Sequence, residues 1–157
     1  MPAGDITLDV KNPGLSVVPG IHLTCYGPYA VPAGATGGKY GEVILDGKVV
    51  VFTDGACRDN QVKAIRRAGL GAFWGDGHPF NFGIPLRAGE QTNNRAELEA
   101  VIRVLELELR PIEIRTDSQY VIDGVMRHRF KWRSAGWRKK RRQIANADQW
   151  IKLDGLL

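Results

Sequence analysis

Three acidic residues stand at the ends of predicted regular elements, and their placement constrains the fold more than any other feature of the sequence. Asp54 follows the apolar run Val49–Thr53. Asp117 follows a second strand-like run, Ile112–Thr116, and Glu97 lies in the first turn of an amphipathic helical pattern. Several carboxylates cannot share one point as bare anions, because like charges raise one another's pKa. A cluster of these acids is therefore typical of a site for a hard divalent cation such as Mg²⁺ or Mn²⁺.

The hydrophobic pattern predicts a mixed sheet flanked by helices. Two further strand patterns, Ala68–Trp74 and Phe80–Ile84, are separated by a turn rich in glycine, which is typical of a β-hairpin. With Val49–Thr53 they form an antiparallel three-strand meander, and Ile112–Thr116 returns parallel to the first strand through a helical crossover. The predicted fold class is therefore α/β, a mixed sheet of this meander plus one parallel strand.

Three helices are expected from apolar spacing and from start and stop signals. They are Asn94–Arg110, Ser118–Arg127 and Asn146–Leu156. Pro111 ends the first, Asn146 is the predicted cap of the third, and Asn94 with Glu97 forms a capping-box arrangement. Capping alone would give Glu97 a purely structural role, which competes with metal binding for the same oxygens.

Residues 1–47 differ in composition from the rest of the chain. They are rich in glycine and proline, so they are expected to form an N-terminal extension ahead of a domain at residues 48–157. The extension is predicted to be a flexible leader or an irregular arm, within which Ile21–Tyr26 could form one short strand.

Basic residues concentrate in one stretch near the C-terminus. The chain has a net charge of +5 and a pI ≈ 9.4, and nine lysines or arginines, with no acid, lie between Gly124 and Ala147. Trp132 and Trp137 are set among them. Cations interleaved with aromatic rings are typical of surfaces that bind nucleic acids. The alternative interpretation, a solvated loop or a targeting signal, stays open at this point.

Other classes of protein are disfavoured. No apolar run approaches the ~20 residues of a membrane-spanning helix, so no membrane partner is expected. The N-terminus lacks a basic region followed by an apolar one, and the two cysteines, Cys25 and Cys57, do not make a disulfide framework. The expected location is intracellular.

Six motifs, in order and with consistent spacing, resemble type 1 ribonuclease H, most closely its eukaryotic form. They span residues 48–157 and are TDGAC, AGLGAFWGDGHPFNFG, QTNNRAEL, TDSQYVIDG, KWRSAGWRKK and NADQWIKLD. The resemblance implies a ribonuclease H-like fold and an enzyme, an endonuclease that hydrolyses RNA in RNA–DNA hybrids to 3′-hydroxyl and 5′-phosphate ends. It assigns catalysis and metal binding to Asp54, Glu97 and Asp117, with two Mg²⁺ ions per site, which Mn²⁺ can replace.

The resemblance also implies a surface for the hybrid. The matching positions are Asn60, Thr92, Asn93, Asn94, Tyr120, Trp132, Trp137, Arg138, Lys139 and Asn146. By this resemblance, the RNA strand is contacted by Asn60, Asn93 and Asn94. Tyr120 and Trp132 line the DNA side. Thr92 and Asn146 match two members of a pocket for a DNA phosphate. Glu90 stands where eukaryotic relatives have the third member, an arginine, and an acid there repels a phosphate.

The sequence departs from the family pattern after its last helix. In the family a strand, a His-containing loop and a helix with a fourth carboxylate follow, and none precedes the end at Leu157. The resemblance therefore predicts a C-terminally truncated domain, with the last family strand and helix missing and one edge of Ile112–Thr116 unpaired. A C-terminal segment, a protein partner, or the extension through Ile21–Tyr26 could complete the sheet.

Two functional hypotheses follow. The first is an active hybrid nuclease, and the second is a non-catalytic ribonuclease H-like module that binds nucleic acid or serves as a subunit of a ribonucleoprotein. The three acids favour the first hypothesis, and the missing fourth acid favours the second.

Overall fold

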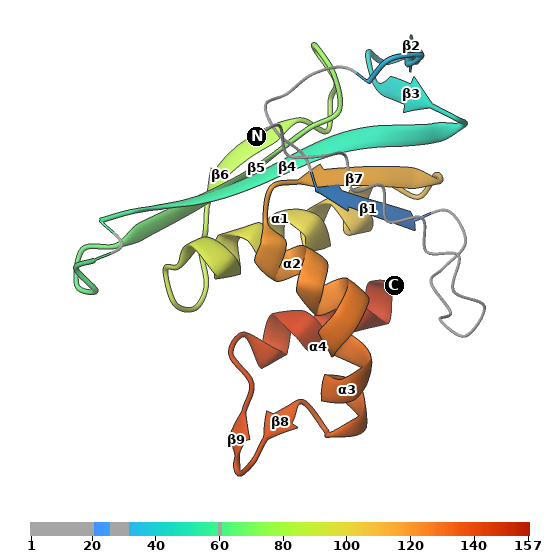
Figure 1. Ribbon diagram of the computed structural model, residues 1–157. Helices are drawn as coiled ribbons and strands as arrows, with labels where there is room; N and C mark the ends of the chain where they lie inside the picture. Colours follow the sequence, from blue (N-terminus) through green and yellow to red (C-terminus); the bar gives the residue numbers. More distant parts are fainter. Residues whose placement is uncertain (1–20, 26–31, 60) are drawn as a thin grey trace, which may run out of the picture.

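Residues 21–25, 32–59 and 61–157 are described by the computed structural model, and Figure 1 shows helices gathered against one face of a sheet. The strands of the sheet are β1 (Ile21–Cys25), β2 (Thr36–Gly37), β3 (Val43–Leu45), β4 (Lys48–Arg58), β5 (Arg67–Phe73), β6 (Phe82–Pro85) and β7 (Ile112–Thr116). The helices are α1 (Asn93–Leu107), α2 (Gln119–Asp123), α3 (Arg129–Ser134) and α4 (Ala147–Leu156), and β8 (Arg138–Lys139) and β9 (Arg142–Gln143) form a separate hairpin. Within these described ranges, no helix has the length and apolarity needed to cross a membrane.

The sheet is organised around β4. One edge of β4 pairs antiparallel with β3 at its start and with β5 over the rest, and the other edge pairs parallel with β7. The order is β1-β7-β4-β3-β2, with β5 and β6 continuing from the second half of β4. The predicted α/β mixed sheet, a meander of β4, β5 and β6 plus the parallel strand β7, is confirmed. β4 extends well past the predicted Val49–Thr53, because β5 pairs with it as far as Arg58.

A strand from the N-terminal extension lies on the outer edge of β7. β1 runs parallel to β7, with Ile21 opposite Ile112. The expected unpaired edge is therefore wrong, and the alternative in which the extension completes the sheet is correct for Ile21–Cys25, while Tyr26 lies outside the described residues. β2 and β3 also join the sheet, so an irregular arm is wrong for that part of the extension. The domain boundary before residue 48 stays a prediction.

The helical layer buries one face of the sheet. α1 packs against β4 and β5, and α4 packs against α1. The largest fully buried side chains of this layer are Trp74, Trp150, Leu98, Ile102, Ile112, Ile114 and Leu153. Full burial of one such aliphatic side chain contributes about 1.5–3 kcal/mol. This layer therefore fixes where the helices begin relative to the strands.

The cap of α1 differs from the prediction, whereas Asn146 occupies the predicted cap position of α4 without a side-chain capping hydrogen bond. Thr92 caps α1, because its Oγ1 accepts a hydrogen bond from the backbone N–H of Arg95 at 3.2 Å, so the predicted cap at Asn94 is wrong. Asn146 precedes α4 in a left-handed conformation (φ 56) and makes no capping hydrogen bond. Its side chain contacts other elements, as described below.

The C-terminal end of α1 is set by a buried ion network. The helix ends at Leu107, before the predicted Arg110, and Glu108 continues in an extended conformation. The Glu108 carboxylate accepts from Trp74 Nε1 at 3.2 Å and from Arg110 Nε at 2.8 Å. Arg110 Nη1 also donates to buried Glu42 Oε1 at 2.7 Å. One arginine thus bridges two buried carboxylates and joins the start of β7 to the start of β3.

The predicted helix Ser118–Arg127 is not a single regular helix. α2 passes into a π-helical turn at Gly124–His128 and then into α3, so helical structure continues beyond the predicted end. A Cβ atom at Gly124 would lie 2.0 Å from a ring atom of Trp150. Glycine at this position lets the segment pack directly against the Trp150 ring.

Replacing Arg110 should destabilise the fold in a pH-dependent way. Its hydrogen bond lowers the pKa of Glu42 from 4.5 to about 2, so this stabilisation is present above pH 4.5 and is lost as the pH falls toward 2. We expect Arg110→Gln to lower the free energy of unfolding by about 2 kcal/mol near neutral pH, less than for a fully enclosed pair, because the Arg110 side chain is 45% exposed.

Urea denaturation at about pH 7 and about pH 3 tests this expectation, and the loss should shrink at the lower pH. Arg103→Gln is the control, because Arg103 makes only a helix-surface ion pair with Glu99. An equal loss of stability at both pH values would contradict the assigned role of Arg110.

Candidate metal centre and nucleic-acid surface

Carboxylates from β4, α1 and β7 meet at one end of the sheet. One oxygen from each of Asp54, Glu97 and Asp117 lies within 4.8 Å of the other two. Parallel pairing sets Thr53 of β4 opposite Thr116 of β7, so Asp54, which lies inside β4, is next to Asp117, which follows the end of β7. The structure thus brings together the three acids that the sequence singles out.

Gly55 allows α1 to approach β4 closely enough to place Glu97. A Cβ atom at residue 55 would lie 2.5 Å from the backbone nitrogen of Glu97 and 2.7 Å from the carbonyl carbon of Ala96. The backbone N–H of Gly55 donates a hydrogen bond to the Glu97 carboxylate. The glycine that follows Asp54 in the sequence is therefore required by the first turns of α1.

Glu97 is the acid of this cluster whose ionised form is most strongly disfavoured. The residue is only 7% exposed, whereas Asp54 and Asp117 are exposed. The pKa of Glu97 is raised to about 8, chiefly by burial and also by the charges of Asp117 and Asp54, while the Gly55 hydrogen bond opposes the change. Its Oε2 is buried without a hydrogen-bond partner. An orphaned buried oxygen beside two exposed carboxylates is the donor set that a hard divalent cation fits.

The start of α1 presents polar groups next to the cluster. Asn93 and Asn94 are exposed in its first turn, and Thr92 is half-buried at the cap. The first backbone N–H groups of a helix have no intrahelical acceptors, which makes such a turn suitable for phosphate or hydroxyl oxygens. Asn60, the third residue predicted to face RNA, lies outside the described residues.

Tyr120 and Asn146 belong to one hydrogen-bond network. The Tyr120 hydroxyl accepts from Asn146 Nδ2 at 3.1 Å and from Trp150 Nε1 at 3.0 Å. Asn146 Oδ1 accepts from Arg95 Nη1 at 3.4 Å. Because an indole and a guanidinium only donate, these bonds fix the orientation of the Asn146 amide. They connect α2 and the N-terminal ends of α1 and α4.

Arg95 is an organising residue that the sequence reasoning missed. Its guanidinium forms a two-pronged contact with Asp148, and its Nε donates to the carbonyl of Ala88 at 3.2 Å. Its own carbonyl accepts from Gln149 Nε2 at 3.0 Å. Arg95 thereby ties the loop before α1, and α1 itself, to α4. The only sequence signal is a basic residue between the polar helix start and Glu97.

The basic arm, Arg129–Gln143, consists of α3 and the β8–β9 hairpin. Trp132 is half-buried, with its ring centroid 5.2 Å from that of Trp150, and Trp137 also packs against the main core. The two tryptophans therefore anchor the arm. The exposed basic residues on it are Lys131, Arg133, Arg138, Lys139, Lys140, Arg141 and Arg142. Arg129 differs, because it is 3% exposed and pairs with Asp154 at 2.8 Å.

The phosphate pocket implied by the resemblance is only partly present. Thr92 Oγ1 caps α1, and both polar atoms of the Asn146 side chain are engaged within the protein. Glu90 is exposed and lies 3.7 Å from Lys63 in an ion pair between two largely solvated side chains. Such a pair is weak, so Glu90 keeps a negative charge at this position.

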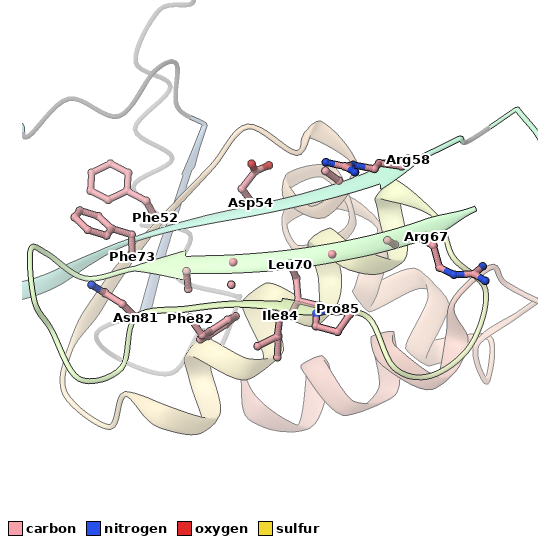
Figure 2. Close-up of a pocket in the computed structure, with 16 residues that line it drawn as sticks. Phe52, Asp54, Arg58, Arg67, Leu70, Phe73, Asn81, Phe82, Ile84 and Pro85 are labelled. Carbon is pink, nitrogen blue, oxygen red and sulfur yellow. The ribbon is translucent and has the colours of Figure 1, made fainter. Parts of the chain in front are cut away.

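A groove of ≈ 1010 Å³ lies on the strands β4, β5 and β6, and Asp54 is the member of the carboxylate cluster that lines it. Figure 2 shows Asp54 and Arg58 on β4, with Arg67 on β5 and Phe82 on β6 beside them. Through Asp54, the carboxylate cluster is thus next to an extended surface of the sheet.

Comparisons with known proteins agree with this architecture. A protein-family model described as RNase H matches residues 46–157. The chain is 37% identical over 113 residues to Ribonuclease H1 of Mus musculus, covering 69% of this chain and 39% of that protein. It is 40% identical over 114 residues to Ribonuclease HI of Caulobacter vibrioides, and the match covers 68% of this chain and 70% of that protein. The chain therefore spans about 39% of the length of the mouse, rat and human Ribonuclease H1 proteins that it matches.

Two solved structures share the fold. LC9-RNase H1, a type 1 RNase H with the type 2 active-site motif, has a TM-score of 0.53 at 25% identity and covers 72% of this chain and 59% of its own. The foamy viral protease-reverse transcriptase in complex with an RNA/DNA hybrid has a TM-score of 0.57 at 22% identity and covers 95% of this chain and 19% of its own. At that identity, the second likeness concerns the fold alone.

Glu97 should make the metal-free protein less stable as the pH rises. Its folded-state pKa of about 8 lies above the ordinary value of 4.5, so ionisation opposes folding, and stability should fall between these two values. Glu97→Gln removes this dependence, and the variant should gain melting temperature relative to the unmodified protein from about pH 5 to about pH 8 in EDTA.

Added Mg²⁺ should reverse the order at the higher pH, because the variant lacks one ligand charge. Glu106→Gln is the control, since Glu106 is a more exposed carboxylate that pairs with Lys152 on α4. If the Glu97 and Glu106 variants followed the same pH curve, Glu97 would not carry the assigned electrostatic cost.

Proposed function

Because the chain belongs to the RNase H family, we propose that it is a metal-dependent endonuclease that hydrolyses RNA in RNA–DNA hybrids and leaves 3′-hydroxyl and 5′-phosphate ends. The observation that carries the proposal is the convergence of three carboxylates within 4.8 Å. A purely structural site has no use for a buried glutamate beside two other acids, whereas strongly perturbed carboxyl groups are typical of catalytic sites.

Mg²⁺ is the cation proposed for this centre, with Mn²⁺ as a substitute. Asp54, Glu97 and Asp117 would hold it. When bound, such a cation supplies Lewis-acid stabilisation of the charge that develops on a phosphate. The protein contributes the placement of the ligands. Gly55 lets α1 approach β4 closely enough to position Glu97, and Asp54 and Asp117 are exposed, so a substrate can reach them.

Polar groups near the starts of α1 and α2 are proposed to distinguish the RNA strand of the hybrid from the DNA strand. Asn93 and Asn94 would contact the RNA strand, where side-chain amides suit 2′-hydroxyl groups. Asn60 has the same proposed role. Tyr120 is proposed to contact the DNA strand. Its hydroxyl oxygen already accepts two hydrogen bonds within the protein, so its proton is available to an acceptor on the DNA.

The basic arm is proposed to hold the phosphate backbone of the hybrid. Trp132 and Trp137 keep the arm attached to the core, and Arg138 and Lys139 are exposed at the base of its hairpin. This contact is electrostatic and independent of base sequence, so it should respond strongly to salt.

A second candidate is a non-catalytic module that binds nucleic acid or joins a ribonucleoprotein. The observation that favours it is that the basic arm is exposed and positively charged. Its cations can attract a phosphate backbone without a metal ion at the carboxylates. Cleavage of a labelled hybrid in Mg²⁺ distinguishes the two candidates, because the second predicts binding without cleavage. A protein partner for either form stays a prediction.

Asp54→Asn should separate cleavage from binding. Loss of this ligand charge is expected to reduce Mg²⁺-dependent cleavage of a hybrid by roughly 100-fold or more, comparable to the effect of removing one charge-stabilising group from a transition state. Hybrid affinity should change little, because the basic arm supplies most of it. Asp46→Asn is the matched control, since Asp46 lies in the β3–β4 turn and is exposed. Undiminished cleavage by the Asp54 variant would count against the proposed centre.

Neutralising the hairpin of the basic arm should weaken binding in a salt-dependent way. Replacing its five basic residues with glutamine is expected to lower the magnitude of the slope of log K against log salt concentration by roughly 0.7–0.9 for each phosphate that is no longer neutralised. The residues are Arg138, Lys139, Lys140, Arg141 and Arg142. Fluorescence anisotropy with a labelled hybrid measures the slope. An unchanged slope would mean that the hairpin is only a solvated loop.

A further inference from the structure

Two arginines occupy opposite positions in the last residue pair of the β4–β5 ribbon. In the antiparallel register Arg58 of β4 lies directly opposite Arg67 of β5, and both are exposed. Like charges placed directly opposite each other destabilise an antiparallel pair. The sheet thus ends in a cross-strand pair that costs stability.

No acid compensates this pair within the described part of the chain. Neither Arg58 nor Arg67 takes part in an ion pair there, although the adjacent Asp59 carries the opposite charge. Among the described residues, the one hydrogen bond of the two guanidinium groups runs from Arg67 Nη1 to the carbonyl of Arg66 at 2.8 Å. Most of their donors remain available for an outside anion.

The arginine pair lies on the same groove as the metal centre. Asp54, Ala56 and Arg58 alternate along β4, so their side chains point to one face of the sheet, and all three line the groove together with Arg67 (Figure 2). Between the acid and the arginines, the floor is made of Ala56 and glycines of β5. Small residues there let the backbone of a ligand approach the sheet closely.

The spacing along β4 matches a nucleic-acid strand. Arg58 is four positions after Asp54 on β4, which at about 3.3 Å per residue is about 13 Å. Phosphates of one strand of a duplex follow each other at about 3.4 Å along the axis, so a duplex whose axis runs along β4 would place the arginines about four nucleotides from the carboxylates. An arginine fork matches the oxygens of a phosphate.

We propose that Arg58 and Arg67 together bind a backbone phosphate of the nucleic acid, about four nucleotides from the phosphate at the carboxylate cluster. This inference rests on the proposed function, because the nucleic acid is the hybrid placed by the metal centre. It adds a second phosphate contact, on the sheet, to that of the basic arm. Figure 1 shows the β4–β5 ribbon and the β8–β9 hairpin projecting from different parts of the molecule.

The test compares two double variants with the same change of charge. Arg58→Gln/Arg67→Gln removes the pair, and Arg103→Gln/Lys152→Gln removes two exposed cations of α1 and α4 that pair with acids of α1. Binding of a labelled RNA–DNA hybrid is measured by anisotropy in EDTA over a range of salt concentrations, so that metal-dependent cleavage cannot consume the probe. Melting temperatures are measured on the same samples.

Removal of the pair should weaken binding roughly three- to tenfold and lower the magnitude of the salt slope by about 0.7–0.9 in total, the value for one phosphate, more than the control does. The melting temperature should stay the same or rise, because a like-charge contact has been relieved. Affinity and slope equal to those of the control would overturn the proposal. A lowered melting temperature that accompanies the weaker binding would also overturn it, because the arginines would then have a structural role.

The position of the contact has its own readout. With hybrids shortened stepwise from either end, the effect of the double variant should vanish for one end only, once the strand no longer reaches the arginine pair. An effect that persists on the shortest hybrids at both ends would exclude the proposed position. Cleavage of the same hybrid in Mg²⁺ by the unmodified protein reports separately on the proposed nuclease function, so the two failures are distinguishable.

Discussion

The burial of Glu97 against two other carboxylates is the interaction on which the arrangement of this molecule depends. It requires the first turns of α1 to cross β4 at a glycine, and it requires β4 and β7 to pair in parallel so that Asp54, inside β4, lies next to Asp117, just after β7. Neither condition lowers the energy of the acids themselves, since the pKa of Glu97 is raised to about 8. The hydrophobic layer between sheet and helices supplies the free energy that keeps the acids in place.

The helix that carries Glu97 is held from two directions. At its N-terminal end, Arg95 binds Asp148 and the Ala88 carbonyl, and at its C-terminal end Glu108 is fixed by Arg110. The first contact also sets Asn146 and, through it, Tyr120. The position of the carboxylate cluster and that of the surrounding polar groups are therefore coupled through one arginine.

The edge of β7 illustrates how a sheet can be completed from an unexpected part of the chain. An exposed strand edge next to the carboxylates would offer unpaired backbone groups to other chains. β1 covers it with the parallel register that the interior of the sheet already has. β1 thereby shields the strand that ends beside Asp117 and gives it a second neighbour.

The sequence by itself determined the elements whose signals are local. The apolar runs of β4 and β7, the glycine-rich turn between β5 and β6, and the helical period of α1 all lie within short segments, so the three acids could be assigned to a common site. Tertiary structure decided what depends on partners distant in the chain. Glu108 leaves α1 for Trp74 and Arg110, Gly124 adapts to Trp150, and β1 pairs with β7. These outcomes depend on which buried group or strand edge is left unsatisfied once the other elements have packed, and no local pattern contains that information.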